Sequence, residues 1–217
     1  MRARIKFSKT EAMRFTGHLD LHRTWERTLR RSGLSLAYSQ GFKPHARINL
    51  ACALPLGFTS QGDIVDVQLD GEPTAREVAS SLERAVPPGI LIESVEIIDQ
   101  NAPTLQSLLE AQEYVITFQE AIPQLDRRLE AVVEAKSLPS RRNNKDYDLR
   151  PLIIHIQRLS DDDSGQDRLL VRLSAKEGAM GRPEEVIRAL GGVPETCRVH
   201  RTNLIFRDIA QAVATNP

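Results

Sequence analysis

The segment richest in reactive and ligand-binding side chains is 37–57, which reads AYSQGFKPHARINLACALPLG. Connecting loops are usually built from Gly, Pro and small polar residues. This segment adds an aromatic ring, an amide, an imidazole and two cations around a Gly-Phe-Lys-Pro turn, and then enters an apolar stretch. The side chains concerned are Tyr38, Ser39, Gln40, Lys43, His45 and Arg47. Because loops commonly carry binding residues, we expect this one to hold a polar or anionic ligand.

A second candidate segment, RFTGHLDLH, covers residues 14–22. His18 and His22 are four residues apart, so they share one face if a helix begins early enough. Three roles fit them: metal ligands with Asp20 or His45 as a third donor, residues that order the start of a helix, or an acid–base or phosphate-contacting role for His18. Neither a HExxH pattern nor a cysteine cluster accompanies them, so we expect no metal.

A third polar segment, SRRNNKDYDLRP, covers residues 140–151. Arg141, Arg142 and Lys145 form a small basic cluster, Tyr147 is available for stacking, and Arg150 follows. The segment lies between the first predicted helix and the second predicted strand of its half of the chain. The Tyr38–His45 loop has the same place in the first half.

Hydrophobic periodicity predicts the elements that position these segments. Alternation in 2–8 predicts a strand with Ala3, Ile5 and Phe7 inward, and 19–32 reads as a helix with Leu21 and Trp25 on its buried face. Thr74-x-x-Glu77 is a capping box that opens a second helix. In the first half we predict strands at 2–8, 47–53, 63–69 and 90–98, with helices at 19–32 and from 74 to before Pro87.

The second half shows the same order, with strands predicted at 113–118, 152–159, 168–175 and 198–206 and helices at 123–136 and 182–190. Two successive βαββαβ series predict an α+β fold of two tandem ferredoxin-like units with antiparallel sheets. We expect the first unit at residues 1–100 and the second at 111–208.

The composition is that of an ordinary globular protein, with 41% hydrophobic and 27% charged residues. No run approaches the length of a membrane span, and the N-terminus lacks the apolar core of a signal peptide. Cys52 and Cys197 fall in predicted strands, where buried thiols are expected. The sequence therefore predicts a cytoplasmic protein that does not enter a membrane.

The net charge of zero hides an asymmetry along the chain. Residues 1–50 hold eleven Lys and Arg against three Asp and Glu, whereas residues 51–135 hold four against fifteen. We predict a basic face on the first unit that contacts phosphates, made of Arg23, Arg27, Arg30 and Arg31 with Arg2 and Arg4. The alternative is a solvated face that the acidic middle balances in space.

Together these segments resemble the radical SAM-linked proteins, a bacterial family of unknown function. Its pattern combines Arg-Phe-x-x-His-x-Asp, Tyr-Ser-x-Gly-Phe-x-Pro-His, Leu-Pro-Leu-Gly and Asp-(Ile/Leu)-Arg-Pro. It falls here on Arg14, Phe15, His18 and Asp20; on Tyr38, Ser39, Gly41, Phe42, Pro44 and His45; on Leu54–Gly57; and on Asp148–Pro151. One departure is Lys43, where the family more often has Asn.

The resemblance implies a partner, because family members are fused to, or encoded beside, radical SAM proteins of the B12-binding type. Neighbouring genes of the family imply RNA metabolism. This chain has two cysteines and no CxxxCxxC, so it cannot hold the iron–sulfur cluster itself. We expect no cofactor in the chain.

The leading functional hypothesis is an accessory RNA- or tRNA-binding domain, without catalysis of its own, that works with a radical SAM protein. One alternative is an enzyme, either an RNA endonuclease or one acting on a small anionic metabolite, with His18 or His45 as acid–base residue. Another is a protein–protein adaptor that uses the acidic middle segment. The predicted binding residues are Arg14, His18, Asp20, Arg23, Arg27, Tyr38, Ser39, Gln40, Lys43, His45, Arg47, Arg141, Arg142, Lys145 and Arg150.

Overall fold

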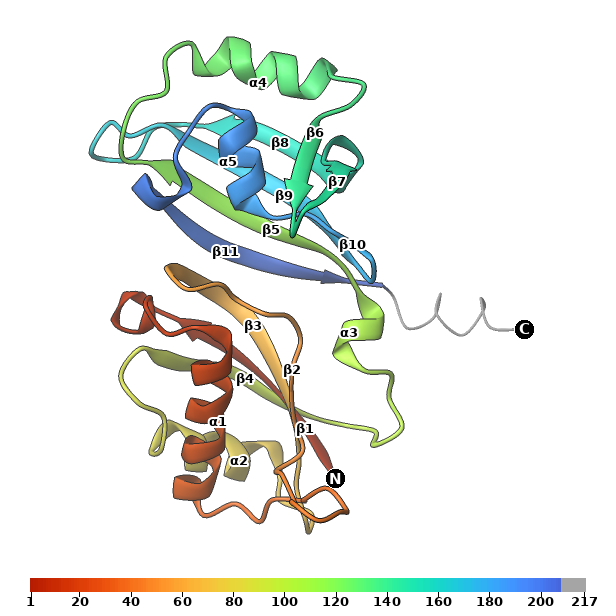
Figure 1. Ribbon diagram of the computed structural model, residues 1–217. Coiled ribbons are helices and arrows are strands. Elements are labelled where there is room, and N and C mark those ends of the chain that lie inside the picture. The colour runs from red at the N-terminus through yellow and green to blue at the C-terminus, as the bar shows by residue number, and fades with distance from the viewer. Residues whose placement is uncertain (208–217) are drawn as a thin grey trace. The chain divides into compact units, whose positions relative to one another are not determined.

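The computed structural model describes residues 1–207 and divides them into two compact units, 1–108 and 109–207. Figure 1 shows that each unit combines an antiparallel sheet with helices packed on it. The predicted α+β class with antiparallel sheets is therefore confirmed. Residue 208, the predicted end of the second unit, lies outside the described residues. Within 1–207 no helix is long and apolar enough to cross a membrane.

Unit 1 is built on a four-stranded sheet in the order β2-β3-β1-β4, in which all neighbours are antiparallel. Its elements are β1 (Arg2–Lys9), the 3-10 helix η1 (Glu11–Met13), α1 (His18–Ser32), β2 (Ile48–Leu50), β3 (Phe58–Gln68), α2 (Ala75–Glu83), β4 (Ile90–Ile98) and α3 (Leu105–Leu108). Helices α1 and α2 cover one face of this sheet (Figure 1).

The core of unit 1 lies between that face and the helices. Ala3, Ile5 and Phe7 are fully buried, as the alternation in β1 predicts. The Phe7 ring meets Trp25 of α1 edge-on, with 4.9 Å between the ring centroids. The capping box is also confirmed, since Thr74 and Glu77 exchange side-chain and backbone hydrogen bonds at the start of α2.

The sheet of unit 1 is bent by two β-bulges at the same level of β1. The β1–β4 register shifts between Lys6 and Phe7, which leaves Glu93 of β4 without an opposite residue. The β1–β3 register shifts between Phe7 and Lys9. The Glu93 carboxylate accepts hydrogen bonds from the Ser8 hydroxyl and from the Gly62 amide of β3 at 3.0 Å. Glu93 thereby ties the two bulges together.

Unit 2 has a sheet in the order β8-β9-β5-β11, again antiparallel throughout, and β10 pairs with the end of β9. Its elements are β5 (Leu109–Phe118), α4 (Leu125–Glu134), β6 (Pro139–Arg142), β7 (Lys145–Asp148), η2 (Arg150–Leu152), β8 (Ile153–Leu159), β9 (Arg168–Lys176), β10 (Ala179–Met180), α5 (Pro183–Ala189), η3 (Pro194–Thr196) and β11 (Cys197–Phe206). Buried apolar residues of α4 and α5, among them Val132 and Val186, belong to the core of this unit.

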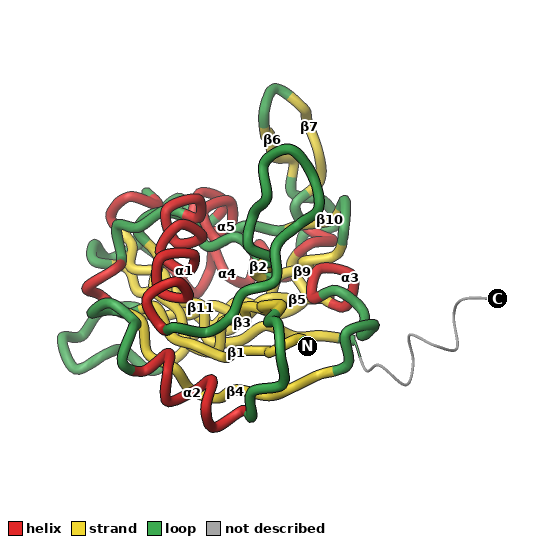
Figure 2. The backbone as a smooth tube through the Cα atoms, turned by 90° about the horizontal axis from the view of Figure 1, so that it is seen from below, coloured by secondary structure: helices red, strands yellow, loops and turns green. Residues whose placement is uncertain are grey.

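The main correction to the predicted elements is a hairpin within the third polar segment. Strands β6 and β7 pair with each other, and Figure 2 shows that they project from the rest of unit 2. The two turn residues, Asn143 and Asn144, both have positive φ, as a type I′ turn requires. The prediction missed the hairpin because its strands are polar on both faces.

Two smaller corrections concern unit 1. Strand β3 begins at Phe58 rather than at residue 63. The prediction missed its first residues because buried polar residues such as Ser60 and Asp63, which bond to each other, interrupt the apolar–polar alternation. Strand β2 ends at Leu50, so Cys52 lies beyond it and is half-buried. Cys197 is buried at the start of β11, and burial raises the pKa of its thiol to about 11.

Candidate functional site

The loop after α1 folds into a short hairpin, residues 38–46, which we call the finger. Tyr38 and Ala46 form an antiparallel bridge at its base. The Ser39 amide donates to the His45 carbonyl at 2.9 Å, and the His45 amide donates to the Ser39 hydroxyl at 3.1 Å. Gly41 closes the turn with a φ of 145°, a conformation that side-chain-bearing residues rarely adopt.

The finger is anchored at the end of β3. The Ala37 amide donates to the Gln68 carbonyl, and the Gln68 amide donates to the Arg47 carbonyl, both at 3.0 Å. The anchored base leaves the tip exposed: the Phe42 side chain is fully exposed and Tyr38 is 42% exposed. Lys43 and His45 are exposed as well. An aromatic side chain in water at a loop tip contributes nothing to the core, which favours a role in binding.

A polar hollow of about 620 Å³ lies at the base of the finger. The predicted residues Tyr38, Ser39, Gln40 and Arg47 line it together with Gln68, Asp70 and Gln100. A second hollow of about 420 Å³ shares Arg47, Gln68 and Gln100 with the first and adds Asn49 and Thr104. We call the two together the amide hollow, because side-chain amides recur along its wall.

The charge of Arg47 is left available in this hollow. Its guanidinium donates to the neutral Gln68 side chain at 2.8 Å. By contrast, Arg2 and Arg4 both bind the Asp66 carboxylate, and Arg2 is 6% exposed. Asp66 lies directly opposite Arg4 in the β1–β3 register, which explains the pairing. The prediction that Arg2 and Arg4 belong to an exposed basic face is therefore wrong.

The α1 part of that predicted face is exposed in the structure. Arg23, Arg27 and Arg30 lie at the surface, and Arg23 forms an ion pair with Asp20 at 3.1 Å. Arg31 donates to the Ala85 carbonyl at 2.8 Å. Exposed ion pairs of this kind contribute little to stability, so the helix retains available cations.

The Arg14–Asp20 segment is held by a buried lysine at the opposite end of β3. The fully buried Lys9 ammonium donates to the carbonyls of Thr16 and Phe58 at 2.8 and 2.9 Å and to that of Arg14 at 3.3 Å. Arg14 and Gly57 are joined by two hydrogen bonds of 2.9 Å, one from each residue. The half-buried His18 is the first residue of α1.

The two candidate histidines therefore do not share a pocket. The His18 segment is bonded to Gly57 and Phe58 at the start of β3, whereas the finger is bonded to Gln68 at its end. Strand β3 has 11 residues, so its two ends lie about 33 Å apart at roughly 3.3 Å per residue. The finger does not run back along α1 toward His18, because its base pairs with the end of β3 instead. Within residues 1–207 no cluster of His, Cys, Asp or Glu is arranged to hold a metal.

In unit 2 the structure separates the predicted basic cluster into engaged and exposed cations. Arg142 forms a two-point ion pair with the buried Glu185 at 2.8 and 2.6 Å and lies over the Tyr147 ring, 5.0 Å from its centroid. The hydrogen bond to Glu185 raises the pKa of Arg142. Arg150 donates to the carbonyls of Ile153 and Val133. Arg142 and Arg150 thus stabilise the unit, while Arg141 and Lys145 remain exposed.

The family of the chain follows from a match along most of its length. The model of the family described as "Uncharacterized protein conserved in bacteria (DUF2344)" matches residues 2–183, a range that contains every predicted site residue. This chain belongs to DUF2344. No curated protein matches the DUF2344 chain in sequence.

Solved structures resemble the DUF2344 chain in fold. A chain of a Cbf5–Nop10–Gar1 complex matches with a TM-score of 0.51 and 11% identity, over 93% of this chain and 48% of that one. A chain of an archaeal box H/ACA sRNP Nop10–Cbf5 complex gives a TM-score of 0.47 and 12% identity, over 93% and 47%. The DUF2344 chain thus spans about half the length of these solved chains. At such identity the first match shows a likeness of fold alone.

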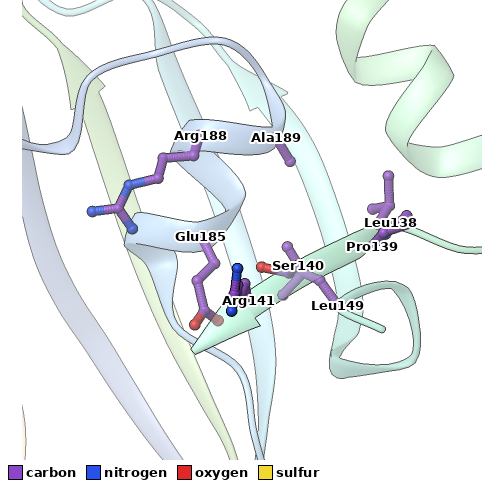
Figure 3. A pocket seen from close by; sticks show the side chains of 8 residues that line it. All are labelled: Leu138, Pro139, Ser140, Arg141, Leu149, Glu185, Arg188 and Ala189. Carbon is purple, nitrogen blue, oxygen red and sulfur yellow. The ribbon is translucent and has the colours of Figure 1, made fainter. Parts of the chain in front are cut away.

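A pocket of about 330 Å³ also lies beside β6 of the DUF2344 chain. Leu138, Pro139, Ser140 and Arg141 line one side, and α5 contributes Glu185, Arg188 and Ala189. Figure 3 shows the Glu185 carboxylate directed toward β6. That carboxylate is already paired with Arg142. We therefore interpret the pocket as a gap left where the hairpin packs on α5, not as a ligand site.

The base of the β6–β7 hairpin is expected to loosen at low pH. Asp148 accepts hydrogen bonds from the Leu138 amide at 2.7 Å and the Arg150 amide at 2.9 Å, and these bonds lower the pKa of its carboxyl. A carboxyl whose pKa is lower in the folded than in the unfolded chain contributes stability at pH values above its unfolded pKa. That stability is lost as the pH falls through its folded pKa. We expect the amide chemical shifts of Leu138 and Arg150 to titrate together below about pH 4. Asp148→Asn keeps an acceptor oxygen but cannot ionise, so the Leu138 and Arg150 amides should not titrate in this variant. If they still titrate together, Asp148 is not the group responsible.

Proposed function

We propose that this chain is an accessory RNA- or tRNA-binding module of the cytoplasm that presents a single-stranded segment to a radical SAM protein. The observation that carries the proposal is the finger, where Tyr38 and Phe42 expose aromatic rings beside Lys43 and the available Arg47. Aromatic side chains stack on unpaired bases while cations follow the backbone. The amide hollow supplies donors and acceptors suited to base edges.

We propose further that both units are ferredoxin-like, with domains at 1–100 and 111–208. The strand orders β2-β3-β1-β4 and β8-β9-β5-β11, each with two helices, support this interpretation. In each unit the connection between the first helix and the second sheet strand carries the extra structure, the finger in one and the β6–β7 hairpin in the other. The radical SAM partner rests on the motif series on Arg14–Asp20, the finger and Asp148–Pro151.

The experiment is an affinity purification of the tagged full chain from its own bacterium, with identification of both the RNA and the proteins retained. We expect a defined RNA species and a radical SAM protein. Treatment of the lysate with ribonuclease should remove the retained RNA, whereas the protein partner should remain. In an untreated control lysate both should be retained. Recovery of a protein partner with no RNA, together with no binding of a purified single-stranded oligonucleotide at low salt, would support the adaptor alternative instead.

A further inference from the structure

The face of the unit 2 sheet opposite its core carries a second concentration of cations, outside the three polar segments described above. Directly opposite residues in neighbouring strands share a face of a sheet. The register places Arg198 of β11 opposite Thr117 of β5, and Thr117 opposite Arg168 of β9. Two arginines from distant parts of the sequence therefore flank one threonine in a single row. The row crosses β9, β5 and β11, which lie side by side in Figure 1.

This row lines a hollow of about 540 Å³. His200 and Thr202 of β11 and Ser164 and Gln166 of the β8–β9 turn line the same hollow. Two strand spacings put the α-carbons of the arginines roughly 10 Å apart, so that their long side chains can reach one group between them. Arginine side chains in this arrangement suit a bidentate contact to phosphate oxygens.

The charges of Arg168 and Arg198 are not neutralised by carboxylates of the described residues. Arg172, on the same face, pairs with Glu113 at 2.8 Å, and Arg158 pairs with Asp126 and Asp167. Among residues 1–207, neither Arg168 nor Arg198 forms an ion pair with a carboxylate. Both guanidinium groups therefore remain available for an anion.

One carboxylate does line the hollow. Asp162 lies in the β8–β9 turn, where one of its oxygens accepts the amides of Ser164 and Gln166, both at 2.9 Å. Its charge opposes an anion and leaves a positive balance of one, from two arginines and one aspartate. The hollow therefore favours a compact, strongly charged anion that engages both arginines at once over a diffuse one.

We infer that this hollow binds a phosphomonoester group, as found at the end of an RNA strand or on a small phosphorylated molecule. The ligand contacts would be the guanidiniums of Arg168 and Arg198 and the hydroxyl of Thr117. This site is independent of the finger and goes beyond the function proposed above. It would hold a terminal phosphate, whereas the finger would hold unpaired bases.

The test is a titration of the full ¹⁵N-labelled chain with inorganic phosphate, followed through the amide signals of Thr117, Ser164 and Thr202. We expect saturable shifts, which Arg168→Gln/Arg198→Gln weakens by at least about ten-fold. The matched control is Arg141→Gln/Lys145→Gln, which removes the same charge from the exposed hairpin and should change the affinity by less than about two-fold. Asp162→Asn keeps its turn acceptor and should tighten binding several-fold. Absence of shifts in the wild-type chain, or equal losses in both double variants, would overturn the inference.

The source of the phosphate is distinguished with two RNA oligonucleotides of one sequence, carrying a 5′-phosphate or a 5′-hydroxyl. Tighter binding of the phosphorylated strand, lost on replacing Arg168 and Arg198, assigns the site to an RNA end. Equal binding of both strands, with phosphate still bound, assigns it to a small phosphorylated molecule. Replacing Tyr38 and Phe42 should leave the phosphate titration unchanged, so failure of the finger proposal and failure of this one give different results.

Discussion

Replacing Lys9 with methionine is expected to lower the free energy of unfolding by about 2–3 kcal/mol. The Lys9 ammonium is fully buried and donates to three carbonyls, those of Arg14, Thr16 and Phe58. Methionine has a similar length but no donor, so the Thr16 and Phe58 carbonyls lose the bonds that Lys9 provides, whereas the Arg14 carbonyl keeps the Gly57 amide. Each buried acceptor left unsatisfied costs about 1–3 kcal/mol, and removal of the buried charge recovers part of that loss. Urea unfolding with an unchanged m-value would measure the difference.

The control for Lys9 is another lysine of the same strand. Lys6 is half-exposed and pairs with Glu93 at 3.5 Å, so Lys6→Met should change stability by less than about 0.5 kcal/mol. Amide exchange gives a second, local measure. In the Lys9 variant the Gly57 and Leu21 amides, which donate to Arg14 and Gly17, should exchange faster. Equal urea midpoints for Lys9→Met and Lys6→Met would contradict this prediction, because the buried ammonium would then contribute no more to stability than the exposed one.

Removing the two aromatic rings of the finger is expected to weaken single-stranded RNA binding by more than about thirty-fold. Stacking contributes roughly 1–3 kcal/mol per base, and Tyr38→Ala/Phe42→Ala removes two stacking surfaces. Since these side chains are exposed, the melting temperature should change little. Fluorescence anisotropy with a labelled oligonucleotide measures the loss, and the salt dependence should stay unchanged because the cations remain.

Replacing Lys43 of the finger and Arg47 at its base is expected to change the salt dependence of binding in the same assay. Lys43→Gln/Arg47→Gln should reduce the slope of log affinity against log salt by roughly 1.4, from about 0.7 for each lost phosphate contact on a single strand. Phe15→Ala is the matched aromatic control, because Phe15 is 77% exposed but lies in the segment bonded to the opposite end of β3. Should Phe15→Ala weaken binding as much as the finger variants, the RNA surface would not be the finger.

Much of the scaffold could be predicted because its signals are local. Alternation in β1, the spacing of Leu21 and Trp25 in α1 and the Thr74–Glu77 capping box each fix an element through contacts within a few residues. The β6–β7 hairpin had a local signal too, the Asn143–Asn144 pair suited to a type I′ turn. It went unrecognised because strands that are polar on both faces show no apolar period.

The candidate site was less predictable because long-range pairing decides it. Local sequence marked the finger residues, yet only the bonds to Gln68 show that His45 lies far from His18. Asp66 neutralises Arg2 and Arg4, and Glu185 engages Arg142, from more than forty residues away. The row of Arg168, Thr117 and Arg198 had no sequence signal, since it exists only in the register of three strands.

The paired bulges around Phe7 also affect how readily β4 could pair with a strand of another molecule. In the described part of unit 1, β4 is an edge strand that exposes Leu91 and Ile97. A long, flat edge with apolar side chains is a template on which another molecule can add a strand and start an aggregate. Here the bulge at Glu93 breaks the regular ladder of β4, and the Glu93 side chain reaches across β1 to the Gly62 amide of β3. Three residues of β4 precede Glu93 and five follow it, so β4 offers only short lengths of regular strand for intermolecular pairing.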